Sequence, residues 1–339
     1  MKTKLAIVLI LSGAITADLL GRERQEPAND TEINQYFNMH SGFWLNLHHF
    51  LYLQAVLATP EARKDGATAV SRAVPVRQMN SEQRVNWDKA LAYYRQFGGS
   101  DPLRDRDLIT ANYELSDAGN TSSIEGRHLN PEMKAALKEA APVYRAVWWN
   151  DQDQKNRKWI ERAALLVRKY GKNLSSRIAS VYGTTWPTDK IPVEVVFYAN
   201  WAGAYTTTHD TLITVSSVDP ANQGNAALEI LFHEASHALI DPVQEALANQ
   251  CRLQAVTLNP PTLWHAILFY TTGILVREQL PGYTPLANSI GLWQRAWPMY
   301  IGPLKTDWQP YLDGKTSFSS ALANLVKDVG HGQPAPQLK

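Results

Sequence analysis

Two histidines and a glutamate stand in the spacing His-Glu-x-x-His within "ALEILFHEASHALI", residues 227–240. Side chains four residues apart on a helix project from one face, one turn apart, so His233 and His237 can share a zinc ion. Zinc lowers the pKa of a bound water towards ~7, and the neighbouring Glu234 can take its proton as the water attacks a carbonyl group. The segment therefore predicts a zinc site with Glu234 as general base.

This motif, in an apolar and helix-like setting, resembles the zincin metallopeptidases, whose active-site helix carries His-Glu-x-x-His. The resemblance covers about residues 190–280, and only His233, Glu234 and His237 match position by position. It implies a mixed sheet packed on the active-site helix, with a peptide or protein as substrate. It also implies an edge strand that pairs with the substrate backbone. We expect "TLITVSS" (211–217) to be that edge, an internal strand being the alternative.

The residues after the second histidine narrow the zincin subfamily. Metzincins continue with a glycine and a third histidine, where this chain has Ile240 and Val243, so that class is excluded. The remaining possibility looks like the gluzincin plan, in which a third ligand, usually glutamate, lies on a following helix. The usual spacing from His237 falls near Val256, which cannot bind zinc, so the third ligand must come from elsewhere.

Three downstream residues compete to be the third zinc ligand. The Asp-Pro pair at 241–242 predicts that one helix ends and another begins. If these helices fold back as a hairpin, Glu245 lies level with His237, and Glu245 is our first choice. If the second helix leaves sideways, His265 in "TLWHAILFYTTG" takes its place. Glu278, in the C-terminal half of the third helix, is a further alternative.

Other residues could complete or imitate such a site. Hydrolysis of an acyl group needs a donor for the oxyanion, and we expect Tyr283, with His265 and Tyr270 as alternatives. His48 and His49 are adjacent on a predicted helix, so their side chains point about 100° apart. We interpret this second histidine pair as structural.

The predicted fold is α+β and mostly helical. A zincin-like metal and catalytic region, residues 184–280, is expected to pack a small mixed sheet on the active-site helix. Helical regions at 34–183 and 281–339 flank it. Capping residues, prolines and glycines set the boundaries, with Asn130 and Pro131 starting one helix and Gly171 ending another. The β-branched segments 191–199 and 211–217 are the predicted strands.

Composition and the N-terminus limit the setting. The chain has 339 residues, of which 45% are hydrophobic and 19% charged, and its net charge of +1 gives no basic face for nucleic acid. Its single cysteine, Cys251, excludes a disulfide scaffold. The start "MKTKLAIVLILSGAITA" predicts a signal peptide at 1–17, followed by a linker at 18–33 and no membrane span thereafter. We expect export to a periplasm or the extracellular space.

These observations predict an exported zinc metallopeptidase, a hydrolase that uses zinc-activated water. The alternative is a non-catalytic secreted helical protein that binds peptide or carbohydrate in a groove and carries a zincin-like or accidental metal motif. The 11 tryptophans suit such a groove, although tryptophans also fill helical cores. Cleavage preference and oligomeric state are left open by the sequence.

Overall fold

The computed structural model describes residues 35–60, 62, 64–207 and 211–331. The expected signal peptide at 1–17 and linker at 18–33 lie outside the described residues. Within the described ranges, no helix is both long enough and apolar enough to cross a bilayer. The chain is mostly helical around one small sheet, as the predicted α+β class requires.

The sheet has four strands in the order β1-β2-β4-β3, namely Phe37–His40, Ile191–Val196, Leu212–Ser216 and Ala204–Thr207. The pairs β1–β2 and β2–β4 are parallel, and β3 runs antiparallel to β4. The expected mixed sheet is thus present. The expectation that residues 211–217 form its edge is wrong. All five residues of β4 are buried, and the strand lies between β2 and β3, which suits its almost unbroken β-branched sequence.

Helices before the sheet pack around a separate core, to which Val196 of β2 and Tyr205 of β3 also contribute. Asn80 starts α4 with a capping box to Gln83, and Asn130 caps α6 with Pro131 in its first turn. The helices are α2 (Phe43–Ala58), α3 (Asp65–Ser71), α4 (Ser81–Tyr94), a 3₁₀ turn (Arg95–Phe97), α5 (Arg106–Ala118) and α6 (Pro131–Tyr144).

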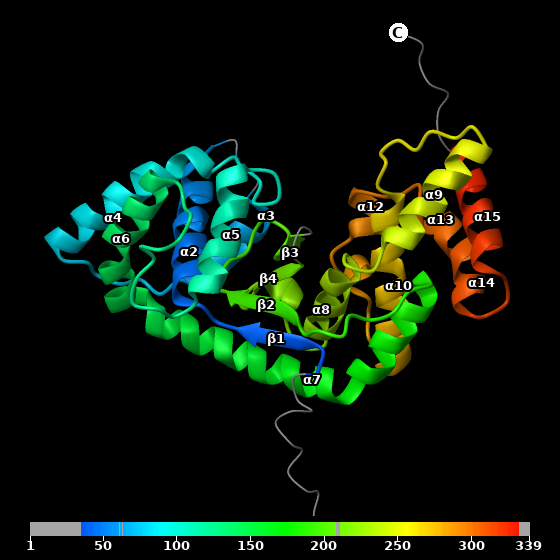
Figure 1. Ribbon diagram of the computed structural model, residues 1–339, viewed down its shortest axis with the longest axis horizontal. Coiled ribbons are helices and arrows are strands. Elements are labelled where there is room, and N and C mark those ends of the chain that lie inside the picture. Colours follow the sequence, from blue (N-terminus) through cyan, green and yellow to red (C-terminus); the bar gives the residue numbers. More distant parts are fainter. Residues whose placement is uncertain (1–34, 61, 63, 208–210, 332–339) are drawn as a thin grey trace, which may run out of the picture.

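A π-helical segment (Arg145–Trp149) leads into α7 (Asn150–Tyr182), which passes below both halves of the molecule in Figure 1. The prediction that this helix ends at Gly171 is wrong. A Cβ at Gly171 would lie 2.8 Å from the ring of Tyr36, so glycine is needed there for close packing, not for a stop. The helix ends instead at Gly183, whose φ of 68° is left-handed.

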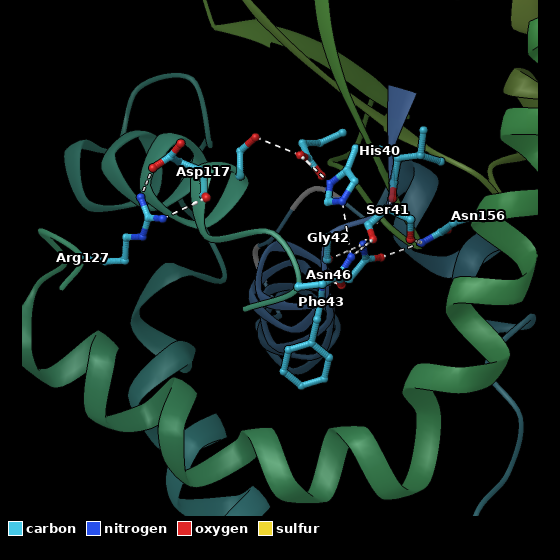
Figure 2. Close-up of polar contacts among 12 residues, drawn as sticks. His40, Ser41, Gly42, Phe43, Asn46, Asp117, Arg127 and Asn156 are labelled. Atoms are coloured by element: carbon cyan, nitrogen blue, oxygen red, sulfur yellow. Dashed lines mark hydrogen bonds and ion pairs between the residues drawn. The ribbon is translucent and has the colours of Figure 1, made fainter. Parts of the chain in front are cut away.

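A buried polar cluster joins β1 to α2 and α7 (Figure 2). The Asn156 amide donates to Ser41 Oγ at 3.0 Å and to Asn46 Oδ1 at 2.9 Å. At the end of β1, His40 Nδ1 lies 3.2 Å from Glu194 Oε1, on β2. These contacts attach the N-terminal helices to the sheet. Residues 34–183, expected to be helical, therefore also supply a strand.

After the sheet, a 3₁₀ turn (Pro220–Asn222) precedes three longer helices, α8 (Ala226–Ser236), α9 (Asp241–Leu253) and α10 (Leu263–Gln279). Helix α10 packs against α8 and α7, whereas α9 packs against α15. Short segments close the chain: α11 (Leu286–Ser289), α12 (Leu292–Arg295), α13 (Ile301–Pro303), a π-helical segment (Leu304–Trp308), α14 (Gln309–Leu312) and α15 (Phe318–His331). Their core also includes one side of the sheet.

Candidate metal centre

Three histidines converge where α8 meets α10. His233 lies in the last turn of α8, His237 directly follows that helix, and His265 lies in the first turn of α10. One nitrogen from each ring lies within 4.8 Å of the other two. The Nε2 atoms of His233 and His265 are 3.3 Å apart. The predicted pair, His233 and His237, is therefore joined by a third imidazole.

The residue beside this pair is His265 and not our first choice, Glu245. Helix α9 leaves sideways after Asp241 and packs against α15, with Val243 and Leu247 buried and Glu245 exposed to solvent. Our hairpin assumption for α8 and α9 was wrong. Because α10 returns along α8, its first turn lies at the metal pair.

Glu278, the other alternative, is exposed thirteen residues further along α10. Helical rise alone places its backbone about 20 Å from that of His265. The cluster that the described residues form therefore contains only imidazoles, with His233, His237 and His265 as its members.

Burial keeps the three imidazoles neutral. It lowers the pKa of His237 to about 4 and that of His265 to about 3. The pKa of His233 falls well below its ordinary value, through burial first and then through the other two histidines. Neutral imidazole is the form that binds metals. His233 Nδ1 is buried and has no hydrogen-bond partner among the described residues. Three converging neutral nitrogens fit a zinc ion with an open fourth position.

The side chain of Glu234 lies beside this cluster and is held there by the sheet. Its Oε2 atom accepts a hydrogen bond of 2.7 Å from the Thr206 hydroxyl on β3, and it lies 4.0 Å from His237 Nε2. Burial raises the pKa of Glu234 to about 7, and the bond from Thr206 opposes that rise. A carboxyl group with such a pKa can accept and return a proton near neutral pH.

Thr206 was missed by the sequence reasoning. It belongs to β3, a strand of four residues that we did not predict, and no motif marks it. The available signal was the short β-favouring run "AYTT" before the predicted strand at 211–217. The contact depends on α8 packing against β3, which is a tertiary feature.

Aromatic rings form the walls of the histidine cluster. Phe269 lies against His233 with 3.8 Å between ring centroids. Trp264 stacks on His265 at 5.0 Å, and Trp297 lies 5.4 Å from the same ring. Trp264 and Phe269 belong to α10, and Trp297 follows α12. Apolar walls of this kind lower the local dielectric and so strengthen interactions with charge at the site.

Tyr283, the expected oxyanion donor, lies elsewhere. It is beside Glu229, one helical turn before His233, and it lines a cavity of about 440 Å³ together with Asn225 and Ala226 at the start of α8. Burial and then the charge of Glu229 raise its pKa. Tyr283 is thus near the opposite end of α8 from His237, and its position does not support the predicted role.

The alternative donors have clear positions as well. The Tyr270 hydroxyl donates to Gln309 Oε1 at 2.8 Å, and His265 belongs to the metal cluster. Among the residues predicted for the site, the structure brings together His233, Glu234, His237 and His265, and leaves Glu245 and Tyr283 outside.

The pair His48 and His49 has the structural character expected from the sequence. His48 Nδ1 lies 2.8 Å from the Tyr94 hydroxyl, and His49 Nδ1 lies 3.0 Å from the Ala199 carbonyl oxygen. His49 Nε2 lies 3.1 Å from the Tyr205 hydroxyl. These rings are held by protein partners inside the N-terminal core.

Comparison with known proteins adds no precedent for this arrangement. No family model, curated protein or solved structure matches the chain. The chemistry of the centre must therefore be inferred from its own residues: three neutral imidazoles, one buried carboxyl group and the hydroxyl that holds it.

Proposed function

We propose that this chain is an exported zinc metallopeptidase with a zincin-like catalytic region, which hydrolyses peptide bonds with Glu234 as general base. The observation that carries the proposal is the position of Glu234. Its carboxyl group is buried, hydrogen-bonded to Thr206 and 4.0 Å from His237, a member of the three-histidine cluster. A site that merely holds a metal has no need of a carboxyl group in this place.

The three histidines supply the donor set. His233, His237 and His265 would hold zinc through ring nitrogens, leaving one position for water or substrate. When bound, such an ion supplies Lewis acidity, which polarises a carbonyl group and makes water acidic near neutral pH. Phe269 packs against the ring of His233, and Trp264 stacks on that of His265.

Glu234 moves the protons. It takes a proton from water as the oxygen attacks the carbonyl carbon of the peptide bond, and it then gives that proton to the leaving amine nitrogen. The C–N bond breaks, and the products are a carboxylate and an amine. Thr206 fixes the carboxyl group for both transfers, because its hydroxyl donates to Oε2. Export rests on the sequence of residues 1–17.

Zinc content measured on the purified protein tests the ligand set. We expect one zinc per chain in the wild type and in Glu234→Ala, and little zinc in His237→Ala or His265→Ala. Glu245→Gln is the matched control, because Glu245 is exposed and outside the cluster. Wild-type protein without zinc would overturn the proposal.

Cleavage of a peptide library, with and without a chelator, tests the activity. We expect cleavage by the zinc-loaded wild type, and none after chelation or in Glu234→Ala. Zinc at full stoichiometry with no cleavage of any peptide would refute the peptidase and favour the alternative, a secreted binding protein that retains a metal site.

A further inference from the structure

A small cavity lies next to the metal centre and shares a wall with it. It has a volume of about 90 Å³. Phe269 lines this cavity and also lies against the ring of His233, at 3.8 Å between centroids. One side chain thus separates the cavity from the predicted zinc ligands.

The polar groups that line the cavity are dominated by donors. Arg277 comes from α10 and Lys305 from the π-helical segment that follows α13. The third donor is the amide of Asn288. Its Oδ1 accepts a hydrogen bond of 3.2 Å from Trp293 Nε1, so its NH₂ group is the part left to donate to a ligand. The Tyr270 hydroxyl is engaged with Gln309.

No residue that lines the cavity is acidic. Asp313 acts on the pKa of Tyr270 in the lining and is itself bonded to Lys315 and Gln309. Glu229 accepts a hydrogen bond of 2.9 Å from the backbone N–H of Leu286, next to the lining. Neither Arg277 nor Lys305 forms an ion pair with another described residue. Arg277 and Lys305 are both exposed to solvent, so water satisfies their charge. The two positive charges at one cavity, with no acidic residue in its lining, attract an anionic ligand to it.

The size and lining of the cavity favour one kind of anion, a carboxylate on a short carbon chain. The remaining lining is apolar and includes Ile274, Pro285 and Ile301. The cavity volume of about 90 Å³ is roughly three times that of a liquid water molecule, ~30 Å³. Guanidinium and carboxylate groups match in planar, two-bond geometry. An apolar wall suits the methylene groups behind a carboxylate better than it suits a phosphate.

We propose that this cavity binds a carboxylate group of the substrate, supplied either by the free C-terminus of a peptide or by an acidic side chain. The inference rests on the proposed peptidase function for its substrate, since a peptide that spans from the zinc ligands past Phe269 would place this group between Arg277 and Lys305. The site would then select peptides by charge at a fixed distance from the cleaved bond.

Peptide binding to the full-length Glu234→Ala variant, measured by titration calorimetry, tests this without requiring cleavage. Three versions of one peptide distinguish the carboxylate sources: a free acid, its C-terminal amide, and the amide with an internal Gln replaced by Glu. We expect the free acid or the Glu-containing amide to bind at least about tenfold more tightly than the neutral amide.

Charge-neutralising variants locate the effect. Arg277→Gln and Lys305→Gln, each placed in Glu234→Ala, should remove that tenfold preference, and Lys305→Arg should keep it. Arg84→Gln on α4 and Lys327→Gln on α15 are matched controls, since both are exposed cations that do not line the cavity. Thermal unfolding checks that every variant is folded.

Two results would overturn the carboxylate site. One is equal affinity for the neutral amide and both acidic peptides. The other is equal loss in the control variants. Inorganic phosphate that competes as well as the acidic peptide would also overturn it, in favour of a general anion site. Failure of the peptidase proposal is seen separately, as zinc-loaded wild type that binds these peptides but cleaves none.

Discussion

Two groups of histidines are buried in this chain, and they differ in what surrounds their ring nitrogens. In the N-terminal core, His48 and His49 each meet a hydroxyl or a carbonyl oxygen within 3.1 Å. Near α8, the Nε2 atoms of His233 and His265 meet each other at 3.3 Å, and His233 Nδ1 has no partner among the described residues. Burial lowers the pKa in both groups.

The difference teaches that burial of histidine does not mark a metal site. A buried polar group costs free energy unless it is hydrogen-bonded. The ring nitrogens of the N-terminal pair meet that requirement with protein partners, so they need no metal ion to be satisfied. Among the described residues, the Nε2 atoms of His233 and His265 in the α8–α10 cluster have only each other as partners, and the buried Nδ1 of His233 has none. An added cation would convert this unfavourable arrangement into a favourable one, which is the physical basis for expecting zinc there.

The largest expected effect is on zinc affinity, when one histidine from each group is replaced by alanine. His265→Ala should weaken zinc binding by more than about 100-fold, because it removes one of the three proposed ligands, whereas loss of supporting residues costs ~10–100-fold. His49→Ala should leave zinc affinity unchanged. Competition with a chromophoric chelator measures both. Equal zinc affinity in His265→Ala and wild type would remove the distinction between the two groups.

The His49→Ala variant, which should keep its zinc affinity, should lose stability. It leaves the Ala199 carbonyl and the Tyr205 hydroxyl without their partner inside a packed core. We expect the free energy of unfolding to fall by about 2–4 kcal/mol, measured by urea denaturation of the zinc-free protein. A stability equal to wild type would show that the N-terminal pair does not act as structural support.

Thr206→Val should show whether Thr206 supports the proposed base, Glu234, or the histidine cluster that would hold zinc. It removes the hydroxyl that holds Glu234 and keeps the shape of the side chain. Relative to wild type, we expect kcat to fall about tenfold, at the lower end of what general-base catalysis contributes, with zinc content unchanged. Thr206→Ser should restore most of the rate. A loss of zinc in Thr206→Val would instead place Thr206 among the supports of the histidine cluster.

Acid should destabilise the zinc-free protein through the buried histidines. His49 has a pKa of about 4 when folded, against its ordinary value of 6.5, so the unfolded chain binds more protons between these values. The stability that neutral His49 contributes is present above pH 6.5 and is lost as the pH falls towards about 4. The free energy of unfolding, followed across this range, should fall in wild type and fall less in His49→Ala.

The smallest effect has the opposite sign and lies at His40. Its hydrogen bond to Glu194 raises the pKa of His40 above 6.5. The resulting stability is fully present below pH 6.5 and is lost as the pH rises through the folded value. His40→Ala should therefore lower the thermal midpoint slightly at acid pH and leave it unchanged well above neutrality. An equal change at both pH values would exclude this ionic contribution.

The sequence predicted those parts of the site that depend on local spacing. His233 and Glu234 lie on α8 and His237 caps its C-terminal end with a helical backbone conformation, so helical periodicity alone places the three together. The third member depends on the path of the chain after Asp241. Nothing within the segment determines whether α9 folds back on α8 or leaves to meet α15. That choice is made by apolar residues such as Val243 and Leu247, whose partners are distant in sequence.

The same distinction between local and distant information applies to the fold. Long helices with capping residues were predicted, as at Asn130 and Pro131, because capping is local chemistry. Strands β1 and β3 have four residues each, too few to show a clear periodicity. Each is a strand only because it pairs with a neighbouring strand of the sheet. Gly171 was misread because its role is to admit the ring of Tyr36, a residue far from it in sequence.

Helix α7 has a consequence for how the molecule denatures. Its 33 residues would extend for about 50 Å. It follows directly on the π-helical segment that supplies Trp148 to the N-terminal core, and it places Trp159 and Leu174 in the other core. Gln152 and Asn156 of α7 are also hydrogen-bonded to Tyr144 and Asn46 in the N-terminal helices. We therefore expect unfolding of either core to free part of this helix. Calorimetry should therefore record one cooperative transition for both cores, and a protease cut within α7 should divide it into two.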